Sequence, residues 1–146
     1  MNSSRSSAVV SIIAAIFIFL FVYTAVSKLM NMPSFKNTLH ASSLIGSRAG
    51  MMAWVVLAAE WVSALLLIYP HFRIAGFSLA LLLMLSFTVY IAAMLLTASR
   101  LPCSCGGILK SLSWKQHFFL NIFLTALAYW AFTLEFRKIR SNAMIK

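Results

Sequence analysis

The sequence predicts an all-α integral membrane protein, a bundle of four transmembrane helices. Its composition, its long charge-free stretches and the position of its bases between those stretches all indicate this fold. Apolar and aromatic residues make up 62% of the 146 residues, and only 10% are charged. A soluble domain usually carries about a quarter charged residues. This chain has too few to cover itself in water, and its length suits one domain over residues 1–146.

The first two membrane-crossing windows occupy the N-terminal half of the chain. A crossing takes about 20 apolar residues at 1.5 Å each. The stretch between Arg5 and Lys28 is free of charge, and residues 49–70 carry a single charge, Glu60. The first window also has features of a cleaved signal peptide. Its apolar core exceeds the usual ~7–15 residues of such peptides, which favours a retained helix.

The other two windows lie in the C-terminal half. Residues 74–99 contain no charge, and residues 118–134 reach crossing length if 115–117 begin the helix. The short connection at Pro70 makes the second and third helices an antiparallel hairpin. The four predicted helices are residues 8–29, 50–70, 74–99 and 115–136.

The distribution of basic residues bears on partner and orientation. The net charge is +10, but the bases are scattered between apolar runs and form no basic stripe, which argues against nucleic-acid binding. Four helices place both termini and Pro70 on one side of the membrane. Each side then holds six bases, so the positive-inside rule gives no decision by count. The cluster at 137–140 favours cytoplasmic termini, with the loop after the third helix outside, where disulfides persist.

That loop carries the strongest chemical signal. Residues 101–107 read LPCSCGG and hold the two cysteines of the chain, Cys103 and Cys105. Thiols two residues apart can close a small, strained disulfide, which is easily reduced and suits an exchanger. Arg100 and the start of the fourth helix favour the thiolate, and His117 is a candidate proton acceptor. In the alternative interpretation, both cysteines are small apolar fillers.

Metal binding is the weaker functional interpretation of the pair, and we predict no metal site. Two sulfurs leave a zinc shell half empty, and His117 or His40 would have to help complete it. Copper(I) accepts two thiolates, so copper stays open.

Glu60 is the second signal, because a charge within a membrane helix is costly and usually has a partner. Lys28, at the end of the first helix, is the natural candidate. Asn121 lies on a polar face of the fourth helix that begins at His117, since the two are four residues apart. Lys28, Glu60 and Asn121 form a predicted buried polar site. In the plainer interpretation, a protonated Glu60 and these polar groups only hold helices together.

These features together resemble the MauE branch of the MauE/DoxX-type redox-associated membrane proteins. Residues in the expected order carry the resemblance: Ser27, Lys28, Leu29, Phe35, Leu39, Trp54, Glu60, the segment 103–107, Trp114 and Asn121. Members often have Cys-Gly-Cys-Phe-Gly, whereas here Ser104 separates the cysteines and Gly107 directly follows Gly106.

The resemblance implies a DoxX-like four-helix bundle in the plasma (inner) membrane. It also implies a link to methylamine utilisation, in maturing the disulfide-rich small subunit of methylamine dehydrogenase. The first hypothesis is therefore a thiol–disulfide exchanger or electron relay for an extracytoplasmic protein partner. A quinone acceptor would fit this chemistry, although no residue pattern specifies one. The alternatives are a non-catalytic assembly subunit, or a small transporter or metal-handling protein centred on Glu60.

Overall fold

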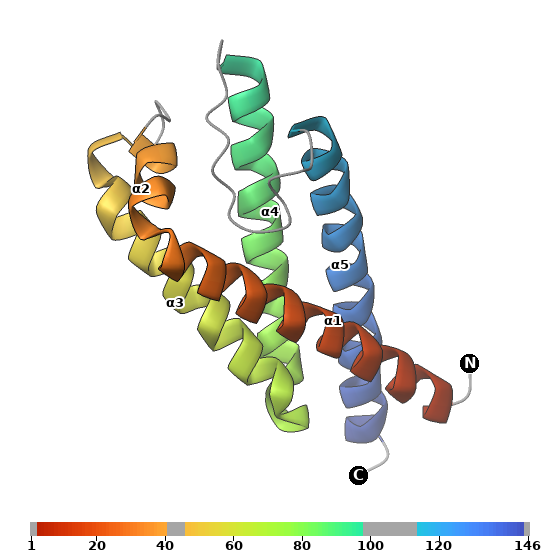
Figure 1. Ribbon diagram of the computed structural model, residues 1–146. Coiled ribbons are helices and arrows are strands. Elements are labelled where there is room, and N and C mark those ends of the chain that lie inside the picture. The colour runs from red at the N-terminus through yellow and green to blue at the C-terminus, as the bar shows by residue number, and fades with distance from the viewer. Residues whose placement is uncertain (1–2, 41–45, 98–113, 145–146) are drawn as a thin grey trace.

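The computed structural model describes residues 3–40, 46–97 and 114–144, and this part of the chain is helical (Figure 1). Its five α-helices are α1 (Ser3–Met30), α2 (Met32–His40), α3 (Ala49–Ile68), α4 (Arg73–Thr97) and α5 (Trp114–Met144). Two 3-10 turns, η1 (Gly46–Arg48) and η2 (Pro70–Phe72), precede α3 and α4. Of the five α-helices, all except α2 are long and apolar enough to cross a membrane. The predicted all-α membrane bundle is confirmed.

The short helix α2 was not predicted from the sequence. It follows α1 because Pro33 has no amide hydrogen to give the carbonyl of Leu29, so the long helix is interrupted there. Backbone hydrogen bonds from Asn31 to Ser27 and from Phe35 to Asn31 carry the chain across the break. The new helix buries Thr38 and Leu39 and packs on α3. The chain therefore continues past Lys28 as a second, short helix.

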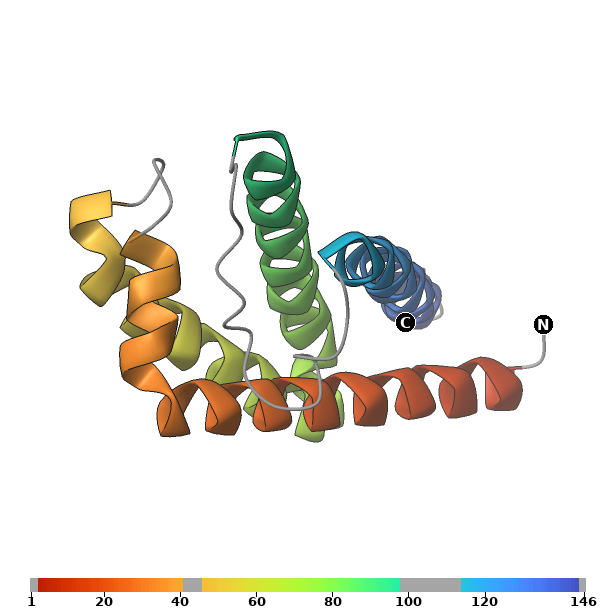
Figure 2. The same ribbon diagram turned by 45° about the horizontal axis from the view of Figure 1, so that its top comes forward.

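The four long helices pack in the order α1, α3, α4, α5, and α1 crosses back over α5. Figure 1 shows α1 crossing in front of the other long helices, and both Figures 1 and 2 show α4 and α5 side by side. Both termini and η2 lie toward the same end of the bundle, opposite α2 (Figure 1). The core where all four helices meet is built around three phenylalanines, Phe17, Phe21 and Phe77.

The α3–α4 hairpin depends on a close approach of its two helices. A Cβ on Gly76 would lie 2.9 Å from the side chain of Leu67 and 3.0 Å from its backbone nitrogen. Only glycine fits this approach without a shift of the helices. Beside it, the buried Ser63 hydroxyl donates to the Gly76 carbonyl at 3.3 Å. This contact fixes α4 against the face of α3 that carries Glu60.

The distribution of polarity is that of a protein in lipid. Large apolar side chains face outward, for example Phe19, which is 73% exposed, and Leu96, which is 87% exposed. Polar groups such as Glu60, Ser63 and Asn121 are instead buried inside the bundle. α5 also runs past the predicted end at residue 136, to Met144. The same helix carries a second buried acid, Glu135, whose carboxylate lies 3.7 Å from the Lys138 ammonium.

Candidate functional site

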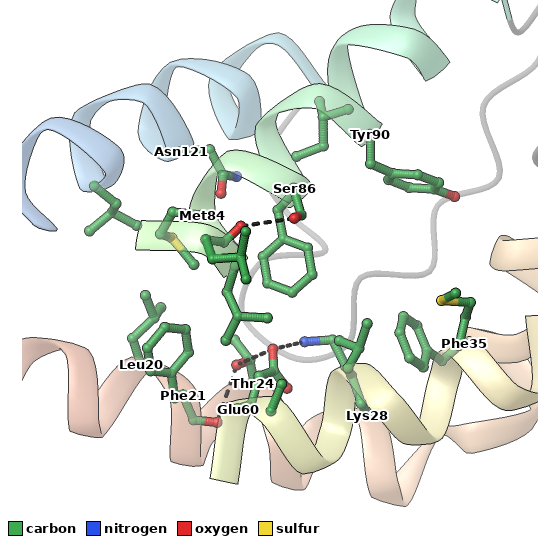
Figure 3. A pocket seen from close by; sticks show the side chains of 18 of the residues that line it. Leu20, Phe21, Thr24, Lys28, Phe35, Glu60, Met84, Ser86, Tyr90 and Asn121 are labelled. Carbon is green, nitrogen blue, oxygen red and sulfur yellow. Dashed lines mark hydrogen bonds and ion pairs between the residues drawn. The ribbon is translucent and has the colours of Figure 1, made fainter. Parts of the chain in front are cut away.

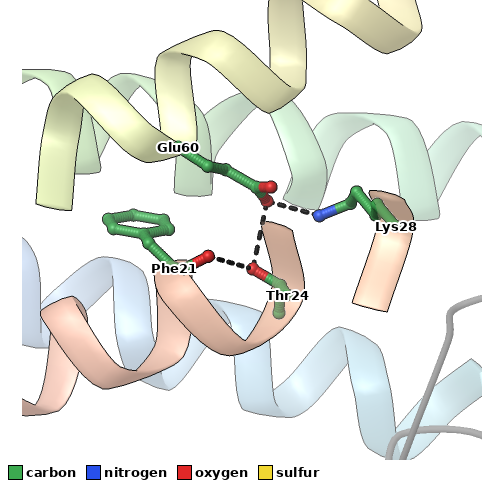
Figure 4. Close-up of polar contacts among 4 residues, drawn as sticks. All are labelled: Phe21, Thr24, Lys28 and Glu60. Atoms are coloured by element: carbon green, nitrogen blue, oxygen red, sulfur yellow. Dashed lines mark hydrogen bonds and ion pairs between the residues drawn. The ribbon is translucent and has the colours of Figure 1, made fainter. Parts of the chain in front are cut away.

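The candidate site is centred on Glu60, the acid in the membrane-spanning helix α3. Glu60 is fully buried, with 0% of its surface exposed, and its side chain projects from α3 toward α1 (Figure 4). An isolated carboxylate in such a place would carry a large desolvation cost. The neighbouring helix α1 supplies the groups that offset it.

Thr24 and Lys28 of α1 both reach Glu60 Oε1. They are four residues apart and so lie on one face of the helix. The Lys28 ammonium forms an ion pair and hydrogen bond with Oε1, and the Thr24 hydroxyl lies 3.2 Å from the same oxygen (Figure 4). The Thr24 hydroxyl is also 3.2 Å from the Phe21 carbonyl, so its single hydrogen serves one acceptor at a time. The structure thus brings Lys28 and Glu60 together.

Two aromatic rings from different helices surround the Lys28 ammonium. Its Nζ lies 5.6 Å from the centre of the Phe35 ring on α2 and 5.2 Å from that of Phe87 on α4. Rings at this distance attract a cation through their electron-rich faces. The Lys28 side chain is 17% exposed, so the ammonium is held mainly by Glu60 and these rings. Burial of this kind fixes the position of the charge.

The second carboxylate oxygen, Glu60 Oε2, is buried and has no hydrogen-bond partner among the described residues. Two hydroxyls of α4 do not supply one, because each donates to a carbonyl of its own helix. Ser86 donates to Leu82 at 2.8 Å and Thr88 to Met84 at 2.7 Å. Oε2 therefore keeps an unused acceptor position on a charged group, where a hydrogen bond would be strong.

Glu60 and Lys28 line a cavity of about 430 Å³ between the helices (Figure 3). Its walls come from all five helices and are mostly hydrocarbon and aromatic. Two wall residues, Val55 of α3 and Leu82 of α4, are also exposed on the outer surface of the bundle. The cavity is thus continuous with the surface that faces lipid. Its size and apolar walls are those of small-molecule sites.

Helices α4 and α5 contribute polar groups to the other wall of the cavity. His117 and Asn121 line it from α5, and Ser86 and Tyr90 line it from α4. The Asn121 amide donates to the His117 carbonyl at 3.0 Å, and the Tyr90 hydroxyl donates to the Thr38 carbonyl of α2 at 3.2 Å. Figure 3 shows Asn121 and Ser86 across the cavity from Glu60 and Lys28. The polar residues predicted on α5 thus share one cavity with two polar residues of α4.

The structure places the predicted site residues unevenly. Lys28, Glu60, Asn121 and His117 all line the cavity. Cys103, Cys105 and Arg100 lie outside the described residues. These three belong to the segment that joins the end of α4 to the start of α5.

Three contributors to the site were missed by sequence reasoning: Thr24, Phe35 and Phe87. A signal for Thr24 existed, because it lies one helical turn before Lys28. Phe35 was named only among the residues that carry the family resemblance, without a role at the site. Phe87 gave no signal, since phenylalanine is common in membrane helices and only the packing selects it. Within the described ranges, no group of three or more histidine, cysteine or acidic side chains is arranged to hold a metal ion.

Comparison with known proteins gives one match. The model of the family described as "Methylamine utilisation protein MauE" matches residues 6–134, which is most of the chain. The matched range begins in α1 and ends in α5, so it contains Lys28, Glu60 and the two cysteines. Neither the search of curated proteins nor the search of solved structures returned a match.

Proposed function

Because the chain belongs to the MauE family of methylamine utilisation, we propose that it is a thiol–disulfide exchanger of the plasma membrane. In this role it would help to mature a disulfide-containing protein outside the cytoplasm, with Cys103 and Cys105 as the redox pair. The observation that carries the proposal is the position of the pair within the family match. In the sequence the cysteines stand between α4 and α5, two helices that line the cavity beside Glu60.

The proposed exchange moves two electrons. A thiolate of the partner attacks one sulfur of the oxidised Cys103–Cys105 pair, forming a mixed disulfide and releasing the other cysteine as a thiolate. The second partner thiolate then displaces the protein, so the partner gains a disulfide and the pair becomes a dithiol. A lipid-soluble quinone is the class of acceptor that would take the two electrons and two protons back from the dithiol.

Residues near the pair have positioning roles in this proposal. Arg100 precedes the cysteines in the chain and favours the thiolate through its charge. His117 lies in the first turn of α5, twelve residues after Cys105, and would accept a thiol proton. The Lys28–Glu60 pair supports the proposal less directly, by holding α1 and α3 at the cavity that His117 also lines.

Trapping a partner tests the proposal. Cys103→Ser and Cys105→Ser each leave one thiol, so one of them should accumulate a mixed disulfide with a periplasmic protein of a methylamine-grown cell. The band should disappear on reduction and be missing from the Cys103→Ser/Cys105→Ser double variant. Lys36→Met is the matched control and should behave as the unmodified protein. If neither single variant captures a protein and the double variant still supports growth on methylamine, the exchange role is wrong.

The same double variant distinguishes the non-catalytic assembly role, because an assembly subunit would function without the thiols. Orientation is tested with a membrane-impermeant thiol reagent applied to intact spheroplasts. We expect labelling of Cys103 and Cys105 only after reduction, which would put an oxidised pair on the extracytoplasmic side. Labelling that requires broken cells would contradict this orientation.

A further inference from the structure

The cavity beside Glu60 has features of a ligand site that the cysteine chemistry does not use. We propose that it binds a lipid-soluble phenol, an aromatic ring whose hydroxyl donates a hydrogen bond to Glu60 Oε2. This proposal concerns binding at the Lys28–Glu60 pair and stands apart from Cys103 and Cys105. The two proposals can therefore fail separately.

The unpartnered oxygen specifies a hydrogen-bond donor. Glu60 is fully buried, and its Oε1 already receives Lys28 and Thr24, while Oε2 has no partner among the residues that the structure describes. A buried acceptor without a donor is costly, and a donor to a charged acceptor gains more than one to a neutral group. The missing partner is thus an O–H or N–H group delivered into the cavity.

The walls specify the body that carries this donor. Phe21, Phe35, Phe87 and Tyr90 line the cavity, and two of these rings already lie against the Lys28 ammonium. Aromatic side chains pack favourably against a further ring in edge-to-face or offset contact. A bound water molecule is a poorer fit, because it needs two to four polar partners and most neighbours are hydrocarbon. A hydroxylated aromatic ring would donate a hydrogen bond to Glu60 Oε2 and pack against the aromatic side chains of the walls.

Size and access are consistent with a ligand from the membrane. The volume of about 430 Å³ lies within the ~300–1,000 Å³ range of small-molecule sites. Val55 of α3 and Leu82 of α4 belong to the cavity wall and are both exposed. A compound dissolved in the bilayer can reach the cavity there without crossing water.

Equilibrium dialysis of the full chain in lipid nanodiscs tests the proposal, with empty nanodiscs as the baseline for partition into lipid. The probes are 4-benzylphenol, its methyl ether 4-benzylanisole, and decanol. We expect 4-benzylphenol to saturate at one molecule per chain. The ether keeps the ring and the oxygen but lacks the donor, so it should bind at least about tenfold more weakly. Decanol keeps a hydroxyl without a ring and should also bind more weakly.

Variants assign the preference to Glu60. The Lys28→Met/Glu60→Leu double variant removes the ion pair as a unit and should bind phenol and ether equally. Lys36→Met removes a lysine outside the cavity and should retain the preference. The proposal is overturned if the unmodified protein binds neither aromatic probe above empty nanodiscs, if ether or decanol binds as tightly as the phenol, or if the double variant keeps the preference. The comparison of probes on the unmodified protein does not depend on any variant folding.

Discussion

Replacing Lys28 with methionine removes the one charged partner that the described structure gives to Glu60. Glu60 is 0% exposed, so its carboxylate would stay buried without compensation, whereas the Lys28 side chain is 17% exposed. Breaking a buried pair from one side costs about 3–5 kcal/mol. Polar groups of the unfolded helices also find partners in a micelle, which reduces the difference between the folded and unfolded states. We therefore expect Lys28→Met to destabilise the protein by about 3 kcal/mol, near the lower end of this range. Because Lys28 reaches water more easily, we expect Glu60→Gln to cost less.

The assay is reversible unfolding in mixed micelles titrated with sodium dodecyl sulfate, followed by circular dichroism. The Lys28→Met/Glu60→Leu double variant removes both charges and fills the space with hydrocarbon. It should therefore lie within about 1 kcal/mol of the unmodified protein, or be more stable.

Lys36→Met is the matched control for this cycle. Lys36 lies on α2 with its Nζ 5.9 Å from the Trp54 ring, a contact of about 0.5–1 kcal/mol at an accessible site. If Lys28→Met costs no more than Lys36→Met, Lys28 does not compensate the buried Glu60 carboxylate. The same conclusion follows if the double variant is as unstable as the single one.

Two further predictions concern the packing around the site. Gly76→Ala should destabilise the protein by about 1–3 kcal/mol, because its Cβ would meet the backbone nitrogen of Leu67 at 3.0 Å. Gly50→Ala, with nothing within 4 Å, should be nearly neutral in the same unfolding assay, and equal effects would show that the α3–α4 approach is not critical. Tyr90→Phe removes the hydroxyl that donates to Thr38 and should speed amide hydrogen exchange in α2 but not in α5. Unchanged exchange in α2 would mean that this bond does not anchor it.

The sequence was informative wherever a single residue carries a strong physical constraint. An acid in an apolar helix is costly and usually has a partner, which directed attention to Glu60 and to Lys28. Four-residue spacing placed His117 and Asn121 on one face, and both line the cavity. The fourth predicted helix ends at residue 136, whereas α5 continues to Met144. Glu135, close to the predicted end, is buried beside Lys138.

The helix α2 shows the limit of reading apolar length. Its residues are too few and too polar to register as a membrane span, so the sequence pattern indicated only a connection. Its position depends on long-range contacts, namely Leu39 packed on α3 and Thr38 accepting the Tyr90 hydroxyl from α4. Contacts between residues so far apart in the chain leave no local periodicity.

By itself, the sequence determined the membrane bundle, since composition and charge-free length follow directly from the cost of polar groups in lipid. It also identified Glu60 as a membrane-embedded acid, with Lys28 as its candidate partner. The tertiary structure was needed to show that Lys28 contacts Oε1 and that Oε2 has no donor among the described residues. It was also needed to show that the rings of Phe35 and Phe87 both lie close to the Lys28 ammonium. These features depend on how helices from distant parts of the chain cross. The crossing angles of the helices are set by the packing of many side chains at once, so they cannot be predicted from any single residue.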